Sequence, residues 1–493
     1  MNPTLALGLI LGYFALLVLI SWLTGRRANS QTFFTANRNS PWYVVAFGMI
    51  GASLSGVTFI SVPGAVGTGA WSYFQVVLGY LVGYAVIAFI LMPLYYRLNL
   101  TSIYGYLGQR YGDRAYRSGS VLFIISRIVG ASLRLYLVGL VLQIAVADHF
   151  GIPFPLTVLI SIGLIYLYTF RAGIKTVVWT DTLQTAAMLT GAVITVWLIG
   201  QEMGWSFGDL WASVQQSSYS DIFVWDWKPD NNFFKQFMSG AAIATVMTGL
   251  DQDMMQKNLT IRTLGEAQRN VLLFSVILII ANLLFLSLGT LLYLYGSESG
   301  LIDPVFVEGC AIRLPDGSCL ATDELFPYLA LNHLGPLAAI VFLVGVIAAA
   351  YSSADSALTA LTTSFCVDIL RFEEKEDESW KRRTRYLVHV AFAGVLLLVI
   401  LAFAALNDRA VINAVFTAAG YTYGPLLGLY AFGLYVKRKV SDRFIPLVCL
   451  LSPIVSYVIA YFSPQLTGYE FGFEILIVNG LLTFLGLWLL SEE

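Results

Sequence analysis

The chain has 493 residues, 58% of them hydrophobic and 12% charged, and its mean hydropathy is +0.74. Soluble proteins carry about 25% charged residues, so this composition excludes a soluble enzyme and favours a polytopic membrane protein. The formal net charge of −2 gives no basis for a nucleic-acid partner.

Apolar runs of about 20 residues recur along the whole chain, and each is long enough to cross a hydrocarbon core of ~30 Å as a helix. We expect the first run to be a retained helix, because it lacks a small-residue cleavage site. The sequence predicts an all-α membrane protein with thirteen transmembrane helices, at 4–24, 42–70, 72–96, 118–147, 153–170, 175–201, 233–256, 270–296, 336–369, 386–406, 410–436, 444–463 and 472–490.

The distribution of Lys and Arg predicts the orientation. With the N-terminus outside, 22 of the 28 basic residues fall in cytoplasmic loops and three fall in outside loops. Such an asymmetry follows the positive-inside rule, so we expect the C-terminus inside. Cys310 and Cys319 then lie in the longest outside loop, on either side of a Pro-Asp-Gly turn. A turn there would bring the two thiols together in a compartment that permits disulfides, so a bond is expected.

The second run contains the stretch GASLSG at 51–56, where a spanning helix would normally carry large apolar residues. Small residues also allow close helix packing. Alternatively, a break at mid-depth exposes backbone carbonyls, which transporters use to coordinate Na⁺ or H⁺.

A second polar segment favours the transporter interpretation. In 348–364, Ala349, Ser352, Ser353 and Ser356 share one helical face, and Asp355 lies beside it. A carboxylate at mid-membrane indicates function, and hydroxyl, carbonyl and carboxylate oxygens suit a hard cation such as Na⁺. We find no nucleophile–base pair, metal cluster or phosphate loop in the sequence, so an enzyme is not expected.

Six stretches, in order along the chain, carry a resemblance to a known family. They are GASLSGVTFISVP, YRLNLTSIYGYLGQRYG, GIKTVVWTDTLQ, DQDMMQKNL, AAAYSSADSALTALTTSFCVDIL and YGPLLGLYAFGLYVKRK. The chain resembles the sodium:solute symporter family, which includes bacterial proline, galactose and sialic-acid symporters.

The resemblance implies one transporter domain over 1–493 with LeuT-like inverted five-helix repeats. The leading helix would be 4–24, the first repeat 42–201, the second repeat 233–436, and the two trailing helices 444–490. The second repeat would have its own broken helix near 245–253, which is again interrupted by Gly and Thr.

The family's sodium ligands fall on matching positions. The resemblance implies a Na⁺ site built from carbonyls of Gly51, Leu54 and Ala349 and hydroxyls of Ser352 and Ser353. It also implies a possible second Na⁺ site, formed by Asp181, Ser352, Asp355 and Ser356. Asp355 replaces a hydroxyl there, and three roles remain open for it: a ligand of a second sodium, a protonatable site, or a partner in an internal ion pair with an Arg. For Asp181, the alternative to binding sodium is a structural bond within the protein.

The solute is expected beside the break, and candidate residues follow from the family's core helices. Arg127 also shares a helix face with Arg134. The Arg with which a sialic-acid member reads its substrate carboxylate aligns with Gly130, between these two. A buried Arg needs an anion, which is either a solute carboxylate or a protein group such as Asp355. The substrate-binding candidates are Ser55, Thr58, Tyr73, Phe74, Gln75, Arg134, Thr245, Thr248, Tyr421 and Tyr423.

The resemblance therefore implies a sodium-coupled symporter that imports a small polar solute by alternating access. An anion such as a sialic acid or a monocarboxylate is one class of solute; sugars and amino acids are the alternative, although Thr58 stands where galactose symporters carry Gln. A solute-sensing receptor or an ion channel is the alternative from another class. We expect Na⁺, the solute and the lipid bilayer as partners, a functional monomer, and a bacterial inner membrane as the location.

Overall fold

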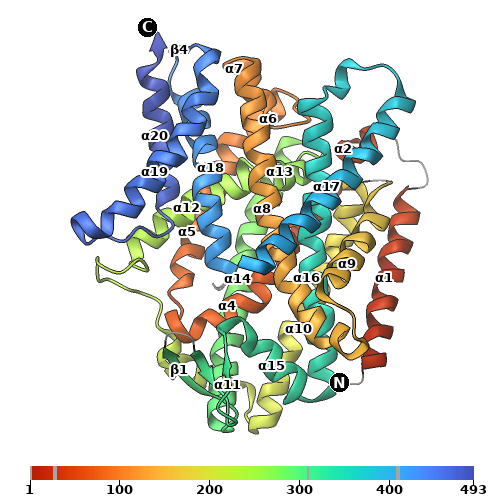
Figure 1. Cartoon of the computed structure of the whole chain (residues 1–493), viewed down its shortest axis with the longest axis vertical. Helices are drawn as coiled ribbons and strands as arrows, with labels where there is room; N and C mark the ends of the chain where they lie inside the picture. The colour runs from red at the N-terminus through yellow and green to blue at the C-terminus, as the bar shows by residue number, and fades with distance from the viewer. Residues whose placement is uncertain (1–2, 26–29, 172, 308–309, 407–410, 493) are drawn as a thin grey trace.

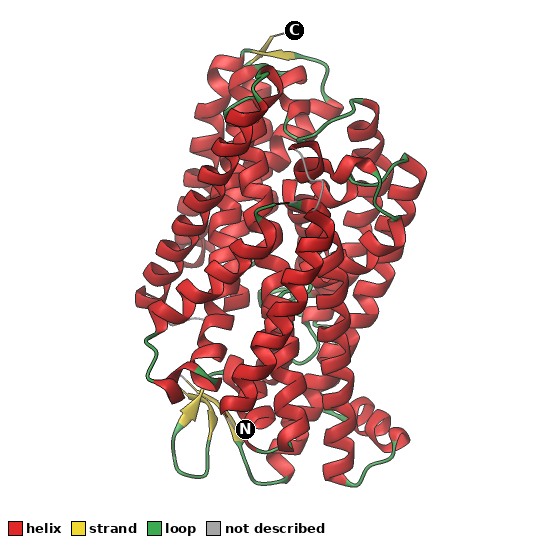
Figure 2. Ribbon diagram, turned by 90° about the vertical axis from the view of Figure 1, so that its right-hand side faces the viewer, coloured by secondary structure: helices red, strands yellow, loops and turns green. Residues whose placement is uncertain are grey.

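The computed structural model describes residues 3–25, 30–171, 173–307, 310–406 and 411–492. It is a helical molecule in which the helices run roughly along the long axis (Figures 1 and 2). The helices are α1 Pro3–Gly25, α2 Ser30–Thr35, α3 Trp42–Ser53, α4 Gly56–Gly69, α5 Tyr73–Val86, α6 Met92–Arg97, α7 Gly105–Arg110, α8 Asp113–Ala145, α9 Phe154–Thr169, α10 Ile174–Met203, α11 Phe207–Gln216, α12 Phe233–Ala244, α13 Gln252–Asn258, α14 Leu264–Glu298, α15 Leu325–Asn332, α16 Gly335–Ser364, α17 Glu378–Leu406, α18 Val411–Tyr435, α19 Ile445–Thr467 and α20 Ile475–Leu489.

Each of the thirteen predicted spans coincides with a helix or a group of consecutive helices. Within the described residues, eight helices are long and apolar enough to cross a membrane, and the bent pair α3–α4 makes a ninth span. The apolar helices α9 and α20 are shorter, α12–α13 is interrupted, and α18 is rich in Tyr, Thr and Gly. Thirteen crossings therefore remain a prediction.

Apolar side chains on the outer helices face away from the protein. On α17, Leu398 is 67% exposed, and on α19, Leu450 is 62% exposed. Large exposed apolar faces on long apolar helices suit contact with lipid. The first helix, α1, begins near the lower end of the molecule as drawn, and α20 ends near the upper end (Figure 1).

The strands are short and lie at the two ends of the helical body (Figure 2). One antiparallel sheet joins β1 Asp303–Val307, β2 Cys310–Arg313 and β3 Cys319–Leu320, and the other pairs β4 Lys439–Val440 with β5 Ser491–Glu492. In the first sheet, Arg313 pairs with Cys319 and Ile312 with Leu320 across the Pro-Asp-Gly turn. The predicted disulfide between Cys310 and Cys319 is confirmed.

Both predicted helix breaks are present. The first separates α3 from α4, whose axes are bent by 54°. The second follows α12, where a π-helical turn at Thr245–Gly249 leads into non-helical Leu250 and Asp251 before α13 begins. Helix α10 contacts both α3 and α16, α5 contacts α12, and α8 contacts α16 and α18. The two breaks therefore lie in the packed interior of one helical body.

Candidate functional site

The first break leaves part of the backbone without helical partners. Helix α3 ends at Ser53, Leu54 has φ −83° and ψ 74°, Ser55 is extended, and α4 begins at Gly56. The Leu54 amide still donates to the Ile50 carbonyl at 2.7 Å, but the carbonyls beyond it lack the donors that a continuing helix would supply. Because this helix end is buried, those carbonyls need a partner other than bulk water.

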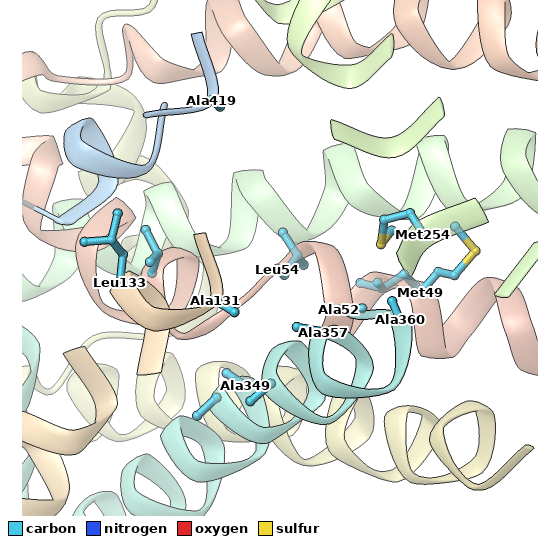
Figure 3. Packing of buried hydrophobic residues seen from close by; sticks show 14 of the residues in the cluster. Met49, Ala52, Leu54, Ala131, Leu133, Met254, Ala349, Ala357, Ala360 and Ala419 are labelled. Carbon is cyan, nitrogen blue, oxygen red and sulfur yellow. The ribbon is translucent and has the colours of Figure 1, made fainter. Parts of the chain in front are cut away.

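Helix α16 brings hydroxyl groups to the same place. It contacts α3 and α4, and Figure 3 shows Leu54 and Ala52 of the broken helix beside α16, which carries Ala349. Ser353 Oγ donates to the Ala52 carbonyl at 3.4 Å. Ser352 Oγ is fully buried and has no hydrogen-bond partner within the described part of the chain. A buried hydroxyl of this kind, next to the carbonyls of the last turn of α3, fits a hard cation such as Na⁺.

Gly51 lies where a side chain would not fit. Its amide donates to Thr185 Oγ1 of α10 at 2.9 Å, which fixes the end of α3 against α10. A Cβ at this position would lie 2.3 Å from Thr185 Oγ1 and 3.4 Å from Ser352 Oγ. The glycine thus permits a close approach among α3, α10 and α16, and its carbonyl is among those of the last turn of α3.

The four residues expected to form a second Na⁺ site also meet in the structure. Ser356 Oγ lies 3.4 Å from Asp181 Oδ2 and 3.3 Å from Asp355 Oδ1, and it donates to the Ser352 carbonyl at 2.8 Å. The phenol of Tyr168 donates to Asp355 Oδ2 at 3.0 Å. Among the described residues, Asp355 has no Arg within ion-pair distance, so the ion pair with an Arg is not formed.

Sequence reasoning missed a lysine at this second set of residues. Lys257 of α13 is 1% exposed, and its Nζ lies 2.8 Å from Asp181 Oδ2 and 4.0 Å from Asp253 Oδ1. The stretch DQDMMQKNL was informative about family, but only the packing of α13 against α10 and α16 shows which carboxylate the lysine meets. Asp181 therefore has a protein cation as its partner.

The second break carries two further carboxylates. Asp251 caps α13 by accepting from the amides of Asp253 and Met254, at 2.9 and 3.2 Å. Arg127 of α8 pairs with Asp253 and lies 3.8 Å from Asp251, while the Tyr423 hydroxyl donates to Asp251. The anion that Arg127 needs is thus supplied by the protein.

A cavity lies beside the first break, with about 720 Å³ of space that includes its opening. Five of the predicted solute residues line it: Ser55, Thr58, Tyr73, Arg134 and Thr248. Arg127, which the sequence places on the same helix face as Arg134, lines it too, and lining residues that the sequence did not indicate include Tyr80, Tyr84, Met247, Asn282 and Phe416.

The other predicted solute residues do not line this cavity. The Gln75 amide donates to the carbonyls of Ser72 and Asn231, and its carbonyl oxygen accepts from the Val224 amide. Because each of these partners is a backbone group, the Gln75 side chain holds neighbouring segments of the chain together. Phe74 is buried at 8% exposure, and the Thr245 hydroxyl donates to the Ala241 carbonyl one turn earlier. The Tyr421 ring packs on the Tyr457 ring. Tyr423 lines a smaller cavity, which Arg127 and Arg134 also line.

Arg134 differs from Arg127 in its partners. It lines both cavities, and its Nε is buried without a hydrogen-bond partner in the part of the chain that the structure describes. No carboxylate of the described residues lies within ion-pair distance of it. A half-buried guanidinium with donors in a fixed planar fork is suited to bind a carboxylate from a ligand.

Aromatic rings separate the cavity from a second hollow. Tyr73 and Phe416 line both spaces, and their rings stack with centroids 6.5 Å apart. The second hollow also contains Thr322 and Asp323, next to the sheet-bearing loop predicted to lie outside. Tyr73 and Phe416 therefore form a thin partition between the candidate solute cavity and that side of the molecule.

Comparison with known proteins identifies the family. A model of the sodium:solute symporter family matches residues 33–442. The chain belongs to this family. Sodium-coupled solute symport, predicted from the sequence, is confirmed at this level, with Na⁺ as the coupling ion. The relatives of this symporter are multi-pass membrane transporters.

Individual relatives are distant but similar over most of their length. This symporter is 23% identical over 472 residues to the sodium/sialic acid symporter SiaT of Proteus mirabilis, covering 94% of this chain and 90% of that protein. It is 25% identical over 448 residues to the human sodium/iodide cotransporter, covering 86% of this chain and 65% of that protein. A substrate-bound, outward-open structure of a Na⁺-coupled sialic acid symporter superposes with a TM-score of 0.81 at 20% identity, covering 99% of this chain and 98% of that one. The two chains share one fold.

Proposed function

We propose that this symporter uses a Na⁺ gradient to import a small organic anion with a carboxylate group. The observation that carries the solute class is Arg134, whose guanidinium lines the cavity and pairs with no carboxylate of the described residues. Arg127, seven residues earlier on the same helix face, is already paired with Asp253 and Asp251. Two relatives are named for the transport of sialic acid and iodide, which are both anions, and this supports the class.

The proposed Na⁺ site comprises the carbonyls of Gly51, Leu54 and Ala349 and the hydroxyls of Ser352 and Ser353. It is supported by the free helix end at the first break and by the Ser352 hydroxyl, which is buried and unpartnered among the described residues. The ligands come from two separate elements, the broken helix and α16. Sodium would therefore stabilise the conformation in which these elements are together, and so favour formation of the adjoining solute cavity.

The topology follows from the same family membership as a proposal. Thirteen spans would form one transporter domain, with a leading helix at 4–24, inverted repeats at 42–201 and 233–436, and two trailing helices at 444–490. The N-terminus would lie outside and the C-terminus inside a bacterial inner membrane, and one chain would contain the whole pathway. The paired helix breaks, one in each proposed repeat, support this arrangement.

Ligand binding raises thermal stability by mass action, so a panel of candidate solutes can identify the solute class. Purified protein in Na⁺ is heated with N-acetylneuraminate, pyruvate, proline, galactose and glucose, and each measurement is repeated in K⁺. We expect stabilisation by one of the anions, N-acetylneuraminate or pyruvate, in Na⁺ alone. A panel in which only neutral sugars stabilise the protein would contradict the proposed class.

A variant series links the result to Arg134. Arg134→Gln should abolish stabilisation by the carboxylate, and Arg134→Lys should retain part of it, because Lys keeps the charge but loses the planar fork. The matched control is Arg171→Gln, since Arg171 is exposed and does not line the cavity. Equal stabilisation of the wild type and Arg134→Gln would exclude the role proposed for this arginine.

A further inference from the structure

Lys257 is a buried cation at the place where a second sodium would be expected. Its Nζ lies 2.8 Å from Asp181 Oδ2, the same oxygen that lies 3.4 Å from Ser356 Oγ. Asp181, Ser352, Asp355 and Ser356 are all fully buried. A buried carboxylate requires a compensating positive charge, and for Asp181 the protein provides one, while Asp355 accepts from the Tyr168 phenol.

The pair belongs to a series of charges that links α10, α13 and α8. Lys257 lies between Asp181 of α10 and Asp253 of α13, and Asp253 in turn pairs with Arg127 of α8. Each of these side chains is at most 5% exposed, so solvent and external ions do not screen them. A sodium ion bound to Asp181 would be held next to a fixed like charge unless Lys257 moved away.

We propose that the Lys257 ammonium permanently replaces the second sodium ion as the cation bound to Asp181. This symporter would then bind and move a single Na⁺ in each cycle. The remaining site is the one between the first break and α16, where Ser352 Oγ has no partner among the described residues. Lys257 is then the residue that sets the number of coupling ions. This inference rests on the proposed first Na⁺ site, and counting bound ions distinguishes the two.

The number of ions determines how the membrane potential acts on transport. One Na⁺ with one monocarboxylate carries no net charge, so the voltage would not drive accumulation of such a solute. Two Na⁺ with the same solute would carry one net positive charge inward, and the voltage would then contribute. A single coupling ion therefore predicts electroneutral transport of a monoanion.

The direct test counts ²²Na⁺ bound at equilibrium to the purified full-length protein without solute. We expect one Na⁺ per chain with a Hill coefficient of 1 for the wild type. Lys257→Ala removes the ammonium and leaves Asp181 free, so two Na⁺ per chain are expected. Lys257→Arg retains a cation and should bind one. Lys235→Ala is the matched control: Lys235 is also buried, but its Nζ lies over the Tyr469 ring, and one Na⁺ is expected.

The outcomes separate the two proposals. Two Na⁺ per wild-type chain, or one in a folded Lys257→Ala protein, would overturn the role of Lys257 and leave the first site standing. No saturable Na⁺ binding by the wild type would overturn the first site itself. If Lys257→Ala does not fold, the double variant Asp181→Asn/Lys257→Met removes both charges together and should bind one Na⁺, while a wild-type count of two still refutes the inference.

Discussion

Gly51→Ala tests whether the first break is held against α10 and α16 as the structure shows. The added Cβ would lie 2.3 Å from Thr185 Oγ1, a distance that forces one of the two groups to move. Overpacking of this kind costs about 1–3 kcal/mol. If the displacement affects the Na⁺-bound conformation by that amount, the dissociation constant for Na⁺ rises about 5- to 150-fold.

The contact is specific enough to be relieved by a second substitution. Thr185→Ala removes Oγ1, and the nearest remaining atom to the new Cβ is the Thr185 Cβ at 3.3 Å, which is tight but adaptable. The single Thr185→Ala variant loses the hydrogen bond to the Gly51 amide, worth about 1 kcal/mol. We therefore expect the double variant to bind Na⁺ about as well as Thr185→Ala, and better than Gly51→Ala.

The assay is a Na⁺ titration of thermal stability for the four proteins of this double-mutant cycle. Gly394→Ala is the matched control, because nothing among the described residues lies within 4 Å of a Cβ added at Gly394. Wild-type Na⁺ affinity in Gly51→Ala would refute the close approach of α3 and α10. Additive losses in the double variant would show that the steric contact is not with Thr185.

Three further predictions address the surroundings of the site. Phe416→Ala removes the ring stacked on Tyr73, and such aromatic pairs contribute about 0.5–1.5 kcal/mol. In a direct binding titration, solute affinity should therefore fall about 2- to 13-fold, while the Na⁺ affinity stays unchanged. Gln75→Leu leaves backbone groups of the outer loop unpaired at about 1–3 kcal/mol each, so thermal stability should fall while the order of preference among solutes, measured by competition, is retained. Cys310→Ser opens the loop closed by the disulfide, which should accelerate proteolytic cleavage near β2 without changing Na⁺ binding. A cleavage rate equal to that of the wild type would contradict the expected acceleration.

The sequence predicted the broken helices because their causes are local. Gly, Ser and Thr at 51–56 and 245–249 are visible in the residue order, and both breaks occur at these places. The shared face of Ser352 and Ser353 likewise follows from helical spacing alone. The number of crossings is harder to predict, because α9 and α20 are shorter than a typical span and depend on neighbours for their place in the bundle.

The solute residues could be predicted only in part, since polarity does not reveal which polar groups already have partners. Gln75 and Arg134 both looked available in the sequence, yet Gln75 is bonded to backbone groups, whereas Arg134 Nε has no partner among the described residues. The Asp181–Lys257 pair joins residues 76 positions apart through the packing of α13 near α10. Such a contact depends on tertiary structure, and no helical or strand periodicity in the sequence indicates it.

The central claim is that a Na⁺ ion held between the first break and α16 drives uptake of a carboxylate. It is tested most directly by uptake of labelled N-acetylneuraminate and pyruvate into proteoliposomes under an inward Na⁺ gradient, with an inward K⁺ gradient for comparison. We expect accumulation of a carboxylate with Na⁺ only, lost in Ser352→Ala and kept in Ser456→Ala, whose hydroxyl donates to a carbonyl of its own helix. Equal uptake with K⁺, or full accumulation by Ser352→Ala, would contradict the account.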